Sequence, residues 1–245
     1  MGKLDGKIAL VTGGNSGIGL AAAKHFVAEG AHVYITGRRE TELAAALKQL
    51  GTSATAVQGD VTSLADLDRL VAQIKREKAK LDIVFAKAGF ARFAPLDKIT
   101  EEHYDLIFNA NVKGVIFTVQ KALPLITDGG SIILNASIVA TKGFADWSMY
   151  SAAKAAVRSF ARTWTMDLKH RHIRVNAVSP GFTDTPAWHV NEAAEQRIPA
   201  IAKTVPHERF ATADEVAKAV LFLASDDSSY ITGADLVVDG GFAQV

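Results

Sequence analysis

Three side chains in the middle of the chain have the types and spacing of a proton-transfer site. Tyr150 and Lys154 are four residues apart and so share one face of a helix, and Ser137 precedes the tyrosine by thirteen residues. A free phenol, with a pKa of about 10, is a poor acid–base group at neutral pH. A neighbouring ammonium favours the phenolate and brings the pKa toward 7, where proton transfer is efficient. Taken alone, the pair also fits an ordinary surface contact between a tyrosine and a lysine.

A glycine-rich turn near the amino end has the context of a dinucleotide-binding site. An apolar run at residues 7–12 predicts a buried parallel strand, a helical pattern then ends near Gly30, and a second strand follows at residues 32–36. Glycines let the backbone approach a pyrophosphate closely, and the helix N-terminus supplies N–H groups to it. The turn residues predicted to bind the dinucleotide are Gly13, Asn15, Ser16, Gly17, Ile18 and Gly19.

Together with further residues, these features resemble the short-chain dehydrogenase/reductase family over essentially the whole chain. No single motif is decisive, but their joint occurrence in one order is specific. The matching residues are Thr12-Gly13-x3-Gly17-Ile18-Gly19, Asp60-Val61, Ala88-Gly89, Asn109-x-Asn111, Ser137, Tyr150-x3-Lys154, Pro180-Gly181 and Asp239-Gly240-Gly241.

The resemblance implies a role for each of four catalytic residues. Tyr150 exchanges a proton with the substrate oxygen, Ser137 orients that oxygen, and Lys154 lowers the tyrosine pKa and binds the nicotinamide ribose. Asn111 bends its helix and holds a water that relays protons to Lys154. The alternatives are that Ser137 only caps a loop and that Asn111 is only a helix-kink residue.

The second predicted strand ends without the acidic residue that usually holds the ribose hydroxyls of NAD. Gly37 stands in that position and is followed by Arg38 and Arg39, whose planar guanidinium groups suit a 2′-phosphate. We therefore predict NADP(H) as the cofactor; the alternative is that the arginines only begin a solvated helix. The resemblance also assigns Asp60 and Val61 to the adenine and Thr185 to the nicotinamide carboxamide, and it adds Ala88, Gly89, Pro180, Gly181 and Thr183 to the cofactor-binding set.

One position departs from the family pattern. Where the family usually has Asn-Asn-Ala-Gly after the fourth strand, this chain has Ala86-Lys87-Ala88-Gly89. Lys87 places a long cation where a compact amide normally bonds to the backbone. Its side chain either extends to solvent or reaches toward the cofactor.

Strands and helices alternate throughout the chain, which predicts an α/β fold. We expect one domain over residues 1–245, with a Rossmann-like, doubly wound parallel sheet of about seven strands and helices on both faces. Strands are predicted at residues 7–12, 32–36, 54–58, 82–86, 130–135, 173–178 and 235–238, and helices at residues 40–49, 64–78, 101–126, 147–169 and 213–224, the helix at residues 101–126 being long and either straight or bent. Ligands bind beyond the carboxyl ends of such strands, where the turns after them gather the candidate residues.

Composition narrows the classes of partner. With 49% hydrophobic residues the chain can form a large core, and a formal charge of +1 gives no sign of nucleic-acid or membrane binding. The absence of cysteine excludes disulfides, and no histidine spacing indicates a metal site. We expect a cytoplasmic protein without a signal peptide, and the resemblance implies a homodimer or homotetramer.

The first-choice function is an NADP(H)-dependent ketone reductase, or alcohol dehydrogenase in reverse. Aromatic residues on loops near the predicted cleft favour an apolar or aromatic carbonyl substrate, and residues 187–204 are predicted to form a substrate lid. Some of these rings have the alternative of belonging to the core or to a subunit contact. The competing functions are a 3-oxoacyl-carrier-protein reductase and a non-catalytic NADP-sensing binding protein.

Overall fold

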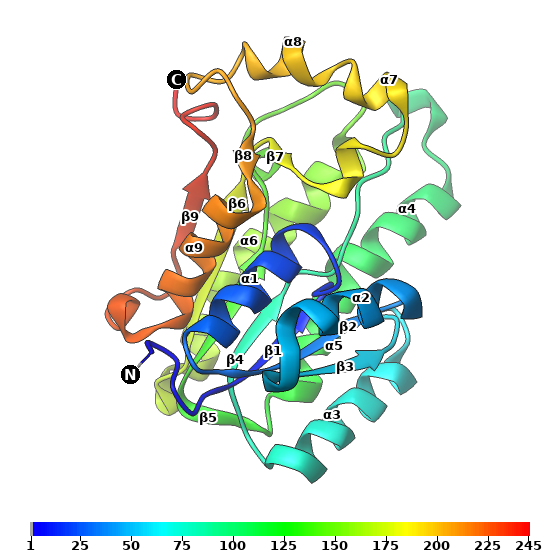
Figure 1. Cartoon of the computed structure of the whole chain (residues 1–245). Helices are drawn as coiled ribbons and strands as arrows, with labels where there is room; N and C mark the ends of the chain where they lie inside the picture. Colours follow the sequence, from blue (N-terminus) through cyan, green and yellow to red (C-terminus); the bar gives the residue numbers. More distant parts are fainter. Residues whose placement is uncertain (1) are drawn as a thin grey trace.

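The structure is a computed structural model that describes residues 2–245. Its main feature is a parallel sheet of seven strands in the order β3-β2-β1-β4-β5-β6-β9 (Figure 1). The order reverses between β1 and β4, and such a switch point leaves a crevice at the carboxyl ends of the strands. The strands are β1 (Ile8–Thr12), β2 (His32–Gly37), β3 (Ala54–Gln58), β4 (Leu81–Ala86), β5 (Ile126–Asn135), β6 (Arg174–Pro180) and β9 (Asp235–Val238).

Helices cover both faces of this sheet and bury a separate core on each. The first core packs α3 (Leu64–Lys78), α5 (Gly114–Ala122) and α6 (Ser148–Leu168) against the sheet. The second packs α1 (Gly17–Ala28), α2 (Glu40–Leu50) and α9 (Ala213–Ala224) against the other face. Successive residues of a strand alternate between them, because strand side chains point to opposite faces. The predicted doubly wound α/β fold is confirmed.

Local sequence signals set where several helices begin. The Ser63 side chain accepts a hydrogen bond from the N–H of Asp66 at the start of α3. Thr100 caps α4 (Glu101–Phe108) in the same way. At α9, Thr212 and Glu215 cap each other reciprocally, which satisfies two helix-end groups.

The long helix predicted at residues 101–126, for which a bend was an alternative, is distorted in its middle and ends at Ala122, so its predicted end is wrong. The segment forms α4, a π-helical turn at Asn109–Lys113, and α5, which ends at Ala122. Pro124 lacks the N–H that a continuing helix needs, and its ring crowds the preceding turn. The chain therefore leaves the helix early and enters β5 at Ile126, four residues before the predicted strand start.

A small second layer was not predicted from the sequence. Two short strands, β7 (Thr183–Asp184) and β8 (Ala211–Thr212), pair in parallel beside the main sheet. The chain between them forms α7 (Glu192–Glu195) and α8 (Ile198–Ala202). Figure 1 shows these helices, in yellow and gold, beyond the ends of β6 and β9, so they cover the carboxyl edge where the candidate site residues gather.

No helix among residues 2–245 has both the length and the hydropathy that a membrane span requires.

Candidate active site

The turn after β1 has a backbone that only glycine fits. Gly13 and Gly17 have φ values of +67° and +52°, in the left-handed region. A Cβ on Gly19 would lie 2.1 Å from the carbonyl oxygen of Gly13. Ser16 precedes α1 without capping it through its side chain, so N–H groups of the first helical turn are left for another acceptor. This is an anion-binding cradle in form.

The turn opens into a groove of about 640 Å³ along the carboxyl edge of the sheet. Such a volume suits a large organic ligand. Nine of the predicted cofactor-binding residues line it: Gly13, Asn15, Ser16, Arg38, Arg39, Asp60, Val61, Ala88 and Gly89. The structure thus brings together a set that follows four different strands in the sequence, β1, β2, β3 and β4.

A further part of the groove lining was not predicted to bind the cofactor, although Ala187 and Val190 fall in the predicted lid. It is formed by residues of α4 and the π-helical turn and by the segment after β7, namely Leu106, Asn109, Ala110, Lys113, Pro186, Ala187 and Val190. The repeated asparagines at 109 and 111 were a usable signal for part of it. The segment after β7 was predicted as a substrate lid at residues 187–204, but its contact with the groove depends on how the chain folds back over the sheet.

One end of the groove carries the two arginines predicted to select the cofactor. A Cβ on Gly37 would lie 2.7 Å from Asn15 Oδ1, so the asparagine fills the position where an acidic side chain would stand. Arg38 is 68% exposed, and its Nη1 lies 3.9 Å from Asp60 Oδ2. Arg39 is paired with Glu42 at 2.9 Å. Arg38 is therefore the guanidinium more available to a phosphate.

The proposed catalytic side chains meet beside Gly89, one of the residues that line the groove, since Lys154 Nζ lies 3.8 Å from the place of a Cβ on Gly89. Ser137 follows β5, while Tyr150 and Lys154 project from α6. The hydroxyl of Ser137 interacts with the Tyr150 phenol and also accepts a hydrogen bond from the N–H of Val139 at 3.4 Å. Lys154 Nζ lies 5.6 Å from the centre of the Tyr150 ring. Ser137 consequently has both the catalytic placement and the loop-capping contact that were alternatives in the sequence.

The pKa values of the pair correct one expectation. Burial raises the pKa of Tyr150 to about 12, and the interaction with Ser137 opposes this rise only in part. Burial, followed by repulsion from Lys87, lowers the pKa of Lys154 to about 7. The lysine ammonium donates to the carbonyl oxygen of Asn135 at 2.8 Å. The predicted lowering of the tyrosine pKa by Lys154 is therefore not found, because the lysine is itself poorly charged and is directed at a backbone carbonyl.

Asn111 is fully buried in the π-helical turn between α4 and α5. Its amide nitrogen donates to the carbonyl oxygens of Ile107 at 3.0 Å and Phe90 at 2.8 Å. Its Oδ1 has no hydrogen-bond partner and faces Gly89, where a Cβ would lie 2.4 Å away. The amide contacts account for the helix distortion. The unpartnered oxygen is an acceptor still to be satisfied, which fits the relay water predicted from the family resemblance.

The last four predicted cofactor-binding residues lie at or after the end of β6. Pro180 ends the strand, and a Cβ on Gly181 would lie 2.7 Å from the Cα of Asp239, which explains the glycine. The Thr183 hydroxyl donates to the carbonyl oxygen of Gly181, which fixes the loop. Thr185 contacts the glycine turn: its Cγ2 lies 3.2 Å from the place of a Cβ on Gly17. Of the four, Thr185 comes nearest to the glycine turn.

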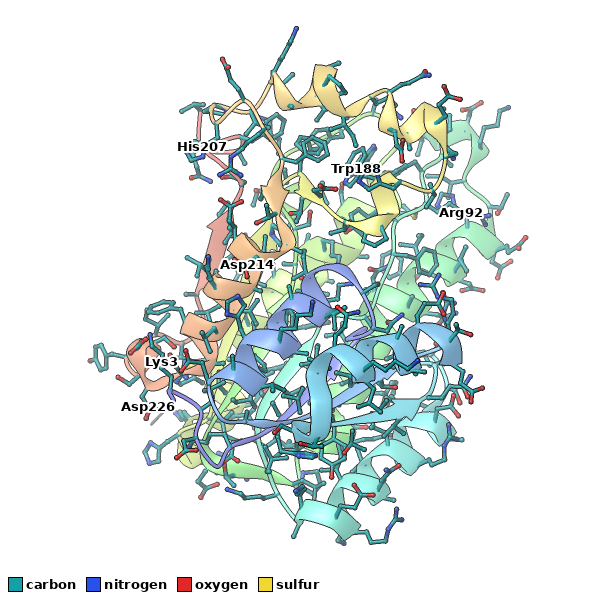
Figure 2. All side chains as sticks on the ribbon, viewed as in Figure 1. Lys3, Arg92, Trp188, His207, Asp214 and Asp226 are labelled. Atoms are coloured by element: carbon teal, nitrogen blue, oxygen red, sulfur yellow. The ribbon has the colours of Figure 1, made fainter. Side chains whose placement is uncertain are left out.

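A chain of aromatic rings extends from Tyr150 toward the predicted lid. Trp147 lies 6.1 Å from the Tyr150 ring and stacks on Phe93 at 4.0 Å between centroids. The chain continues through Phe144 and Phe182 to Trp188, which Figure 2 shows in the segment that crosses above the sheet. Loops separated by up to about a hundred residues in the sequence thus supply one apolar surface next to the proposed proton donor.

Among residues 2–245 there is no group of three or more histidine, aspartate and glutamate side chains arranged to hold a metal ion.

Comparison with known proteins agrees with this geometry. A family profile described as "Enoyl-(Acyl carrier protein) reductase" matches residues 13–243. The oxidoreductase asL5 of Sarocladium schorii is 48% identical over 99% of this chain and 98% of its own length. Galactitol 2-dehydrogenase of Agrobacterium fabrum is 39% identical, with 98% of each chain covered. A solved structure titled "short chain dehydrogenase/reductase family protein" has a TM-score of 0.88 and 38% identity over 99% of this chain and 100% of its own.

Fold and sequence together define a Rossmann-like oxidoreductase. The chain belongs to the short-chain dehydrogenase/reductase family.

Proposed function

We propose that this enzyme uses NADP(H) to interconvert a ketone and a secondary alcohol, with Tyr150 as the general acid–base. The observation that carries the proposal is that the cluster of Ser137, Tyr150 and Lys154 borders a groove lined by Gly13 and Arg38: Lys154 Nζ lies 3.8 Å from the place of a Cβ on the groove residue Gly89. When bound, the dinucleotide supplies or accepts the hydride.

The residues of the groove fit such a cofactor. The glycine turn and the uncapped N-terminus of α1 suit its diphosphate, and Arg38 suits a 2′-phosphate where no carboxylate opposes one. Thr185, against Gly17, lies where its hydroxyl can hold a carboxamide. NADP(H) is thus favoured over NAD(H) by the side chains at residues 15, 37 and 38.

Tyr150 then transfers the proton. A phenol whose pKa is raised to about 12 is fully protonated at neutral pH, which suits it to donate to the oxygen of a ketone being reduced. Ser137 holds that oxygen next to the phenol, and the buried Lys154 lies close enough to stabilise the phenolate once the proton has left. The state of Tyr150 therefore favours reduction over oxidation near pH 7.

The substrate class follows from the apolar surface beside Tyr150. The rings of Phe93, Phe144, Trp147 and Trp188 offer stacking and few polar partners, which favours an apolar or aromatic ketone over a polyol. The residues at 187–204 are the proposed lid over it. Galactitol, named for one relative, has hydroxyls that these rings cannot bond.

A 3-oxoacyl-carrier-protein reductase is the second candidate, because the protein named 3-oxoacyl-[acyl-carrier-protein] reductase FabG of Thermotoga maritima is 35% identical over 98% of this chain. It requires a basic surface at the mouth of the site. A measurement of NADPH and NADH consumption with aromatic ketones, simple ketones, galactitol-type ketoses and acyl thioesters separates the candidates. The proposal expects NADPH and aromatic ketones to give the highest kcat/KM. A preference for NADH, or turnover of acyl thioesters alone, would contradict it, and binding of NADPH without turnover of any substrate would favour a sensor.

We further propose a homodimer or homotetramer in the cytoplasm. The stacked pairs Tyr104–Phe108 on α4 and Phe160–Trp164 on α6 give these contacting helices partly exposed apolar side chains, and Tyr104 is 46% exposed. Sedimentation of the purified protein tests the oligomeric state, and a monomer at micromolar concentration would contradict it.

A further inference from the structure

Lys87, the residue that departs from the family pattern, lies inside the dinucleotide groove. Its backbone N–H donates to the Thr12 hydroxyl at 3.0 Å, which fixes the start of the side chain at the end of β4. Its Cδ lies 3.3 Å from the place of a Cβ on Gly13, so the aliphatic stem lies along the glycine turn. The residue is half-buried and lines the groove wall. The side chain therefore reaches toward the cofactor rather than out to solvent.

The Lys87 ammonium has no hydrogen-bond or ion-pair partner among residues 2–245. The groove lining contains four cationic residues, Arg38, Arg39, Lys87 and Lys113, and one acidic residue, Asp60. Asp60 already accepts two hydrogen bonds from Thr62 and lies near Arg38. A half-buried cation without a counter-charge is unfavourable unless a ligand supplies one.

Lys87 also faces the catalytic lysine. Repulsion from Lys87 is the second cause, after burial, of the lowered pKa of Lys154. Burial lowers the pKa of Lys87 as well. The groups around Lys154 are Tyr150 on its own helix, Lys87 from the end of β4, the Asn135 carbonyl of β5 and the uncharged Asn111 of the π-helical turn. None of them is a carboxylate.

We propose that Lys87 is a dinucleotide-binding residue whose ammonium takes the negative charge of the cofactor diphosphate, so that binding also relieves its repulsion of Lys154. The proposal rests on the proposed function, since it requires a nicotinamide dinucleotide in the groove. The same contact has a second effect. Once the diphosphate neutralises Lys87, the repulsion of Lys154 is smaller, and Lys154 takes up a proton as the cofactor binds.

The direct test is calorimetric titration of NADP⁺ into wild type, Lys87→Met and Lys169→Met. Lys87→Met keeps the length of the side chain and removes its charge, and Lys169→Met makes the same change at an exposed lysine after α6. We expect Kd for NADP⁺ to rise about tenfold in Lys87→Met, the size of one charge-assisted hydrogen bond, and to stay unchanged in Lys169→Met. The increase of Kd with salt concentration should also become less steep in Lys87→Met.

Two further measurements distinguish a contact between Lys87 and the diphosphate from a contact elsewhere on the cofactor. Adenosine 2′-phosphate lacks the diphosphate bridge, so its Kd should be the same in wild type and Lys87→Met. At pH 8, titrations in buffers of different ionisation enthalpy should show proton uptake by wild type on NADP⁺ binding, and less uptake by Lys87→Met, in which Lys154 is free of that repulsion before the cofactor binds. If Lys87→Met does not fold, Lys87→Asn, which carries the amide usual in the family, takes its place.

The outcomes that overturn the proposal differ from those that overturn the function. An unchanged or lower Kd for NADP⁺ in Lys87→Met would show that the lysine does not bind the cofactor, or that it obstructs the groove. Equal weakening of both ligands would place Lys87 at the adenosine end. A wild-type protein that binds neither NADP⁺ nor NADPH would overturn the proposed function together with this contact.

Discussion

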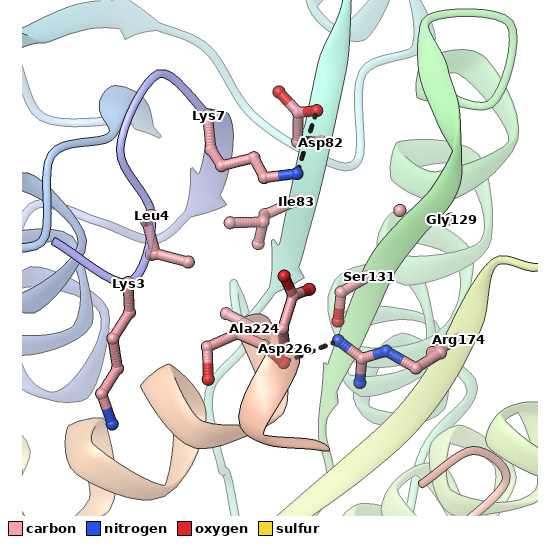
Figure 3. Close-up of a pocket in the computed structure, with 12 residues that line it drawn as sticks. Lys3, Leu4, Lys7, Asp82, Ile83, Gly129, Ser131, Arg174, Ala224 and Asp226 are labelled. Carbon is pink, nitrogen blue, oxygen red and sulfur yellow. Dashed lines mark hydrogen bonds and ion pairs between the residues drawn. The ribbon is translucent and has the colours of Figure 1, made fainter. Parts of the chain in front are cut away.

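The two ends of the parallel sheet differ in whether their polar and charged side chains have partners. At the amino ends of the strands, Lys7, Asp82, Arg174 and Asp226 surround a cavity of about 20 Å³ and lie close to their counter-charges (Figure 3). At the carboxyl ends, Lys87 has no partner, and the side-chain oxygens of Asn111 and Asn135 accept no hydrogen bond among the described residues. Figure 2 shows how far apart the two ends lie, with Lys3 and Asp226 near one and Trp188 near the other.

At the amino end, the buried polar groups of Asp82 and Arg174 are bonded to other residues of the chain. Asp82 is 5% exposed and accepts from the N–H of Ile8 at 2.8 Å and the Thr127 hydroxyl at 3.2 Å, with Lys80 Nζ at 3.2 Å. Arg174 donates to the carbonyl oxygens of Leu223 and Ser225 and to the Ser228 hydroxyl. These bonds are internal and serve stability. Unsatisfied groups of the same kinds at the other end are costly to the fold, so we infer that a ligand satisfies them.

Tyr150→Phe should produce the largest effect and separates chemistry from binding at the carboxyl end. Loss of the phenolic proton should reduce kcat at least about a thousandfold, within the range for a general acid. The Kd for NADPH, measured by fluorescence titration, should change little because the phenyl ring keeps its place in α6. Retention of wild-type kcat would show that another group transfers the proton.

Arg174→Met makes the matching change at the amino end. Loss of three hydrogen bonds from a partly buried guanidinium should lower the free energy of unfolding by about 3 kcal/mol. Urea denaturation measures this change. The Kd for NADPH at 25 °C should equal that of wild type. A higher Kd would show that the amino end also influences cofactor binding, contrary to the proposed contrast.

Arg38→Ala should have a smaller and more selective effect. Because the guanidinium is proposed to bind a 2′-phosphate, kcat/KM with NADPH should fall about tenfold, and kcat/KM with NADH should stay constant. An equal fall for both cofactors would assign Arg38 to a structural role, through its proximity to Asp60.

The smallest expected effect is a pH dependence of hydrogen exchange in the predicted lid at residues 187–204. The imidazole of His189 bonds to Asp184 at 2.7 Å and to Glu195 at 3.0 Å, and these bonds raise its pKa, Asp184 more than Glu195. The protonated His189 therefore stabilises the folded conformation of residues 187–204. This stabilisation is fully present below the unfolded pKa of about 6.5 and is lost as pH rises through the raised pKa of the folded state. Hydrogen exchange at residues 187–204, corrected for intrinsic rates, should therefore accelerate across that range. In His189→Gln the corrected rates should not change with pH.

Much of the fold could be predicted from the sequence, because apolar runs and turn residues determine secondary structure locally. The strands predicted at residues 54–58 and 235–238 and the helices at residues 64–78 and 213–224 have the observed bounds, since alternation of strand and helix patterns marks them. The helix predicted to reach residue 126 ends at Ala122, because Pro124 cannot continue it. The β7–β8 pair has only two residues in each strand, too few for any periodic pattern.

The site was predictable as a set of residues but not as an electrostatic environment. Spacing on one helix placed Tyr150 and Lys154 on one face, and strand ends placed Ser137 nearby. Whether Lys154 is charged depends on its burial and on Lys87, which lies 67 positions away in the sequence and comes near it because β4 and β5 are neighbours in the sheet. No sequence pattern encodes that pairing, which is why the expected direction of the Tyr150 pKa was wrong.

Thermal melting of wild type and Arg174→Met, each with and without NADPH at a hundred times its Kd, tests the contrast between the two ends most directly. A ligand at that concentration adds about 2.7 kcal/mol, and the account predicts that Tm rises by roughly 5–10 °C, equally in both proteins, although Arg174→Met starts from a lower Tm. An unchanged Tm of wild type at millimolar NADPH would contradict it, because the unpaired groups at the carboxyl end would then have no dinucleotide to satisfy them.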